Sequence, residues 1–98
     1  MSEGYILSKS YLPNKKFMVI TPSGQKIHFG SFGYSDFTKH KDLQRKENYL
    51  SRHSTREDWT DLSKAGTWSR YILWNKPTLS GSIKDMEKRF GIKIKYSL

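Results

Sequence analysis

The sequence predicts an α+β domain in which a small antiparallel β-hairpin or three-stranded sheet packs against two to three helices. Two patterns indicate this class: apolar segments on either side of a turn at residues 22–24, and a helical apolar period that begins at Leu79. The length of 98 residues fits one domain, because two independent cores are not expected at this size. Aromatic residues make up 14% of the chain, which argues against disorder since disordered chains are poor in aromatics.

Residues 1–14 carry little apolar periodicity and end at Pro13-Asn14, so we expect a flexible N-terminal arm there. Tyr5 and Tyr11 give this arm two aromatic side chains for docking on a partner or on the rest of the protein. Residues 15–98 are then expected to form a single small α+β domain.

The hairpin is predicted over residues 15–30. An apolar run from Phe17 to Ile20 is followed by a Pro-Ser-Gly turn, after which Ile27 and Phe29 alternate with polar residues. An isolated hairpin is only marginally stable in water, so its apolar face must be covered by other elements.

A helix is predicted from Asp36, its expected N-cap, to about residues 51–53. Its apolar stripe is thin, because only Phe37, Leu43 and Leu50 fall on one side. The rest of the helix is charged and must face water or a partner.

Residues 54–66 read as an irregular connection, and a compact aromatic segment follows from residue 67. Trp68, Tyr71 and Ile72 have helical spacing, which favours core packing against the hairpin. Tryptophan and tyrosine are also favoured in interfaces, and we expect at least one of these aromatic residues to face a partner. The candidate aromatic anchors are Trp59, Trp68, Tyr71 and Trp74.

The clearest predicted element is the C-terminal helix, because Leu79, Ile83, Met86 and Phe90 recur at helical spacing. Its N-terminus fits a capping box at residues 82–85, or a cap by residue 78 one turn earlier. Gly91 is a natural helix terminator. The alternating residues 92–97 after it are expected to add a third strand to the hairpin.

Lysine and arginine number 18 against 9 acidic residues, which gives a net charge of +9 with neutral histidine. Such a field attracts nucleic acids and acidic protein surfaces alike. The expected partner- or polyanion-binding residues lie on one face of the first helix and on one face of the last strand. They are Lys39, Lys41, Arg45, Lys46, Arg52, Lys93 and Lys95.

No catalytic residues, metal or cofactor are expected. His40 and Asp42 are two residues apart, which points them in different directions on a helix, and His53 is almost four turns away from His40. The loop Gly30–Gly33 lacks the glycine spacing and the lysine of a phosphate-binding loop. The absence of cysteine suits a reducing compartment, and no apolar run approaches the ~20 residues of a membrane span.

Several residue blocks resemble a small family of basic proteins from large eukaryotic DNA viruses, the giant viruses of amoebae and algae. The resemblance covers residues 15–91, with small departures at Thr67 and Tyr71. It implies no catalytic residues and no established activity. The blocks that carry it are His28-Phe29-Gly30, Gly33-Tyr34-Ser35-Asp36, His40-Lys41-Asp42 and Trp74-Asn75-Lys76-Pro77-Thr78-Leu79.

The resemblance implies a location in the virion or in a viral factory in the host cytoplasm. We therefore expect a non-enzymatic structural protein, namely a minor capsid-associated component that docks on capsid or other virion proteins. The alternative, which rests on charge, is a sequence-independent DNA- or RNA-binding protein for genome packaging. A membrane partner is not expected, and the sequence does not define the oligomeric state.

Overall fold

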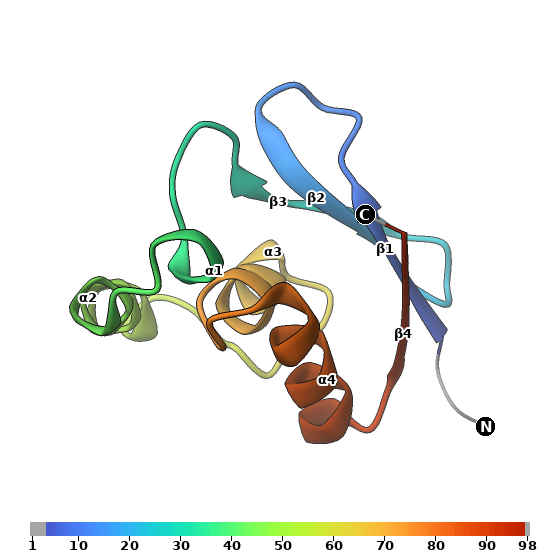
Figure 1. Ribbon diagram of the computed structural model, residues 1–98. Coiled ribbons are helices and arrows are strands. Elements are labelled where there is room, and N and C mark those ends of the chain that lie inside the picture. Colours follow the sequence, from blue (N-terminus) through green and yellow to red (C-terminus); the bar gives the residue numbers. More distant parts are fainter. Residues whose placement is uncertain (1–3, 98) are drawn as a thin grey trace.

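The computed structural model describes residues 4–97 and has an α+β fold, as the sequence predicts. Its sheet has four strands, β1 (Gly4–Lys9), β2 (Lys15–Ile20), β3 (Lys26–Ser31) and β4 (Lys93–Ser97), in the order β3-β2-β1-β4. The three N-terminal strands are antiparallel neighbours, whereas β4 runs parallel to β1, so the sheet is mixed. The helical segments lie on one side of this sheet (Figure 1).

The predicted hairpin is confirmed as β2 and β3, with Phe17 opposite Phe29 and Val19 opposite Ile27. The predicted flexible arm is wrong over residues 4–9, because β1 is an interior strand whose Tyr5 and Leu7 are buried. β1 has only two residues that point into the core, and so short an alternation does not identify a strand from the sequence. The structure of residues 1–3 lies outside the described residues.

The last strand is also confirmed, but its predicted place beside the hairpin is wrong. β4 pairs with β1, with Tyr5 opposite Ile94, and so β1 separates it from β2 and β3. A parallel pair requires a long crossover, and the helical segments between β3 and β4 supply it.

The predicted single helix over residues 36–53 is two helices, α1 (Phe37–His40) and α2 (Leu43–Ser54). Lys41 breaks them with a left-handed backbone, φ 54°. Asp36 caps α1, and the side chain of Asp42 accepts from the amides of Gln44 and Arg45 to cap α2. Aspartate competes for backbone amides in this way, which is why it starts helices and weakens their interiors.

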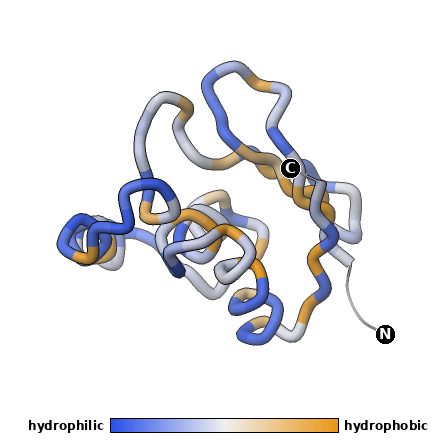
Figure 2. The backbone as a smooth tube through the Cα atoms, viewed as in Figure 1, coloured by the Kyte–Doolittle hydropathy of each residue, from blue (hydrophilic) through white to orange (hydrophobic). Residues whose placement is uncertain are grey.

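Figure 2 shows that α2 is mainly hydrophilic. The predicted apolar stripe is wrong at Leu43, which is 65% exposed, and the buried residue of α2 is Tyr49. Sequence periodicity missed this face because an aromatic side chain rather than an aliphatic one carries the packing.

The core lies between the sheet and the C-terminal half of the chain. Trp68 ends α3 (Ala65–Trp68), which continues directly into a π-helical turn, η1 (Ser69–Leu73). Trp68 and Ile72 are fully buried against the sheet, as is Met86 of α4 (Leu79–Phe90). Thr78 caps α4, so the earlier of the two predicted starts is the real one, and Gly91 ends it with φ 63°.

The segment Trp74–Thr78 joins these helices to α2. Asn75 is 3% exposed, and its amide donates to the Asp85 carboxylate (2.7 Å) and to the Tyr71 carbonyl oxygen (3.3 Å). Its own carbonyl oxygen accepts from the Lys46 ammonium at 2.6 Å. The block that the resemblance emphasised is therefore a structural junction between α2, η1 and α4.

Candidate nucleic-acid interface

The predicted basic residues of the first helix divide into two kinds. Lys39, Lys41, Arg45 and Arg52 are exposed. Lys46 is less available to bind a partner, because its ammonium already donates to the Asn75 carbonyl oxygen and lies 4.9 Å from the centre of the Phe37 ring. Burial, with nearby Arg70, lowers the pKa of Lys46. The sequence predicted that Lys46 lies on the solvent-exposed face of the helix, whereas in the structure its side chain is partly buried.

The structure does not bring Lys93 and Lys95 together with these residues. Both lie on β4, at the opposite end of the molecule from α2 (Figure 1). Helix and strand therefore do not form one basic surface.

Each of the four aromatic anchors contacts the protein itself. Trp68 is fully buried and donates from its indole nitrogen to the Leu62 carbonyl oxygen at 2.9 Å. Trp59 and Tyr71 both face the Arg70 guanidinium, with ring centres 5.5 Å and 4.9 Å away. Trp74 stacks on Tyr49, at 4.4 Å between ring centres and 4° between ring planes.

The three most exposed aromatic side chains of residues 4–97 lie elsewhere, on two loops at one end of the sheet. Tyr11 is 66% exposed and belongs to the β1–β2 loop, whereas Phe32 (69%) and Tyr34 (73%) belong to the β3–α1 loop. The two loops enclose an open groove of about 720 Å³, which we call the aromatic groove. All three rings line it.

The aromatic groove is also basic. Lys9, Lys15 and Lys39 line it, and within residues 4–97 none of their ammonium groups forms an ion pair. A fourth lysine in the lining, Lys16, is neutralised by Asp36, the one acidic residue of the lining. The groove therefore combines free positive charge with exposed rings.

A buried ion pair holds the β3–α1 loop in place. The Lys16 ammonium donates to the Asp36 carboxylate at 2.5 Å, and the two side chains are only 9% and 2% exposed. The same carboxylate accepts from the Thr38 amide at 3.0 Å and from the Thr38 hydroxyl. The Phe32 amide also donates to the Asn14 carbonyl oxygen at 3.0 Å, which ties the two loops together.

Glycine gives this loop its shape. Gly33 has φ 93°, a backbone conformation that residues with a Cβ avoid, and it lies between the two exposed rings. The sequence signal for the groove is thus an aromatic-glycine-aromatic run with no periodicity.

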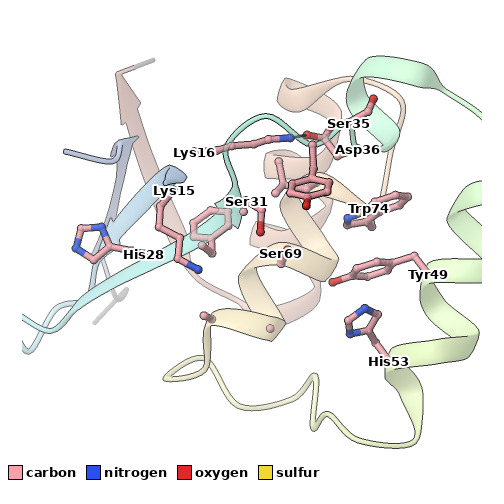
Figure 3. Close-up of a pocket in the computed structure, with 16 residues that line it drawn as sticks. Lys15, Lys16, His28, Ser31, Ser35, Asp36, Tyr49, His53, Ser69 and Trp74 are labelled. Atoms are coloured by element: carbon pink, nitrogen blue, oxygen red, sulfur yellow. Dashed lines mark hydrogen bonds and ion pairs between the residues drawn. The ribbon is translucent and has the colours of Figure 1, made fainter. Parts of the chain in front are cut away.

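A second, smaller cleft of about 380 Å³ lies between the β3 edge and α2 (Figure 3). Tyr49 forms its far wall, sandwiched between the Trp74 ring and the His53 ring, whose centre is 4.3 Å away. His53 in turn contacts Glu57 at 3.2 Å. In Figure 3 the Tyr49 hydroxyl points into the cleft towards Ser69.

Tyr49 supplies a pH prediction. Burial raises its pKa above the ordinary value of 10.0, although the hydrogen bond from Ser69 opposes this. A tyrosine with a raised pKa stabilises the fold fully below pH 10.0, and this contribution is lost as the pH climbs towards its folded-state pKa. We expect Tyr49→Phe to remove this alkaline loss, measured as the free energy of unfolding in urea at a series of pH values.

The wild-type and Tyr49→Phe proteins must be compared directly, because the lowered pKa of Lys46 acts in the opposite direction over part of the same range. Parallel pH curves for the two proteins would contradict the prediction.

Within residues 4–97, no three histidine, aspartate or glutamate side chains gather closely enough to hold a metal ion. His40 and Asp42 meet only locally, where the His40 ring nitrogen accepts from the Asp42 amide at 2.9 Å. In the same part of the chain, none of the helices has the length and apolar character needed to cross a membrane.

The chain matches a known protein family. The model of a family of unknown function, DUF5754, matches residues 5–53, which is half of the chain. The chain belongs to this family. No curated protein and no solved structure gives a significant match. The segment matched to DUF5754 runs from β1 into α2 and includes every residue that lines the aromatic groove.

Proposed function

We propose that this protein binds nucleic acid without base specificity, through the aromatic groove, and that it is not an enzyme. The observation that carries the proposal is that three exposed rings and three lysines meet in one open groove, and that these lysines form no ion pair within residues 4–97. Single exposed apolar side chains are ordinary on protein surfaces, whereas exposed apolar groups that gather in one patch mark interaction sites, and these three residues line one groove.

The two kinds of side chain match the two parts of a nucleotide. Rings stack on bases whatever their identity, because every base has a flat π-face. Lysines neutralise backbone phosphates and release counterions, which makes binding strong at low salt and weak at high salt. The net charge of +9 adds long-range attraction.

The test is the double variant Phe32→Ala/Tyr34→Ala. Loss of each base–ring contact costs about 1–3 kcal/mol, so we expect affinity for nucleic acid to fall by roughly 30-fold or more, measured by fluorescence anisotropy. Tyr96→Ala is the matched control, since Tyr96 is 48% exposed but lies on β4. Equal affinity of the wild type and the double variant would refute the proposed site.

Salt dependence tests the lysines separately. With three phosphates neutralised on a single strand, replacing Lys9, Lys15 and Lys39 by alanine should reduce the slope of log K against log salt by about 2. An unchanged slope would mean that the phosphates contact other lysines or arginines.

A second candidate is the structural role in a virus particle that the resemblance implies, as a minor capsid-associated component. The outer face of the sheet favours it, because none of the helices in residues 4–97 lies over this face and Ile6 is 48% exposed there beside the exposed Lys95. Under this proposal the face docks on acidic capsid or other virion proteins. Within a virion or a host-cell viral factory, the nucleic-acid-binding role corresponds to genome packaging.

Location within purified particles separates the two roles. Surface labelling and fractionation should recover the protein with the shell if it is capsid-associated, and with the genome core if it packages nucleic acid.

A further inference from the structure

We propose that the bound nucleic acid is a single strand that leaves the aromatic groove across the β3–α1 loop and continues along α2. The inference rests on the proposed function and assigns the ligand class and the path. The continuation is a third cleft, of about 570 Å³, which we call the arginine cleft. Its lining residues are Tyr34, Ser35, Arg45, Asn48, Ser51, Arg52 and Trp74.

The two clefts share a wall. Tyr34 and Ser35 line both the aromatic groove and the arginine cleft, so the β3–α1 loop is a ridge with one cleft on each side. A nucleic-acid strand whose base stacks on the Tyr34 ring in the aromatic groove has its next phosphates at the entrance of the arginine cleft. The 73% exposure of Tyr34 leaves its ring accessible on this ridge.

The charges of the arginine cleft suit phosphates. Arg45 and Arg52 are exposed, and no ion pair joins either guanidinium to a carboxylate within the described range 4–97. They are seven residues apart on α2, which places them on one face about 10 Å apart along the helix axis. Guanidinium groups bind phosphate oxygens in a bidentate manner, so the pair can hold two points of one backbone.

Contacts within the protein hold part of the lining of the arginine cleft in place. Trp74 lines it, and the coplanar stack of Trp74 on Tyr49 fixes the Trp74 ring. The Asn48 amide oxygen accepts from the Gln44 side chain at 3.1 Å, which holds Asn48 on the α2 surface. A preformed wall lowers the entropy cost of ordering the cleft when a ligand binds.

The rings identify the ligand as single-stranded. In a duplex each base is covered above and below by its neighbours, so a protein ring reaches a base face only after unstacking. An unpaired strand presents those faces without this cost, and it bends over a ridge more easily than a duplex does.

The experiment compares single-stranded oligothymidine of about 12 nucleotides, a strand of about 5, and a duplex of the longer length, since known single-strand sites span roughly 4–16 nucleotides. We expect the wild type to bind the long strand at least about tenfold more tightly than the duplex and than the short strand. Fluorescence anisotropy at fixed low salt measures all three.

Arg45→Gln/Arg52→Gln tests the path. We expect it to weaken binding of the long strand about tenfold and binding of the short strand less than about twofold. Lys84→Gln/Lys88→Gln is the matched control, because it removes two exposed charges from α4 and should change neither affinity by more than about twofold. Thermal unfolding of both variants establishes that they are folded.

Three results would overturn the inference while leaving the proposed function intact: equal affinity for duplex and single strand, equal losses on the long and short strands, or equal losses in the arginine and lysine variants. Failure of the wild type to bind any nucleic acid at low salt would instead refute the proposed function.

Discussion

Trp68→Ala is expected to remove a large part of the protein's free energy of unfolding. The Trp68 side chain is fully buried, with its ring centre 5.4 Å from that of Tyr5 and 6.3 Å from that of Phe29, and it joins η1 to the sheet. Truncating a buried tryptophan costs about 3–5 kcal/mol, and here the indole hydrogen bond to Leu62 is lost as well. Native domains have only about 5–15 kcal/mol of stability in total.

Urea denaturation followed by circular dichroism measures this effect. Trp59→Ala is the matched control, because Trp59 is only partly buried and contacts Glu57 and Arg70 near the surface. We expect it to cost less than about half as much. Similar losses in the two variants would mean that the core is not centred on Trp68.

The second large effect is expected at Asp36. Asp36→Ala leaves the Lys16 ammonium without a partner in a site where it is only 9% exposed, and it removes the cap of α1. Breaking a buried ion pair from one side costs about 3–5 kcal/mol, because the remaining charge is uncompensated. The free energy of unfolding in urea should fall by about this amount.

Two comparisons make the Asp36 result specific. Asp42→Ala removes the cap of α2, but the Asp42 side chain is exposed, so we expect a loss of only about 1 kcal/mol. Adding Lys16→Met to Asp36→Ala removes the orphaned charge and should recover part of the stability. If the double variant is less stable than Asp36→Ala, the uncompensated charge is not the cause.

Sequence patterns predict some of the strands and helices of this protein and miss others. β2, β3 and α4 have enough alternating or helical apolar positions to be predicted, and the predicted turn and cap residues stand at their ends. β1 has two inward residues, and its partner β4 is at the far end of the described chain. Which strand pairs with which depends on tertiary packing, and no local pattern records it.

Only the overall charge of the candidate site could be predicted from the sequence, and not which side chains form it. Net charge indicated a polyanion or acidic partner, and Arg45 and Arg52 are indeed exposed on α2. Tryptophan content says nothing of exposure: of the predicted aromatic anchors, Trp68 packs in the core and Trp74 stacks on Tyr49. Phe32 and Tyr34 have no periodic neighbours, so only the fold reveals that they share a groove with Tyr11.

The parallel pairing of β1 with β4 also determines the order in which the molecule can assemble. β1 finds β2 across a loop of five residues, 10–14, whereas its contact with β4 closes a loop that contains every other element. Contacts between distant segments form late, because the entropy of closing a long loop must be offset before the contact stabilises anything. During synthesis, the edge of β1 that β4 covers therefore stays open until residues 93–97 emerge, and until then this unpaired edge is open to aberrant strand pairing.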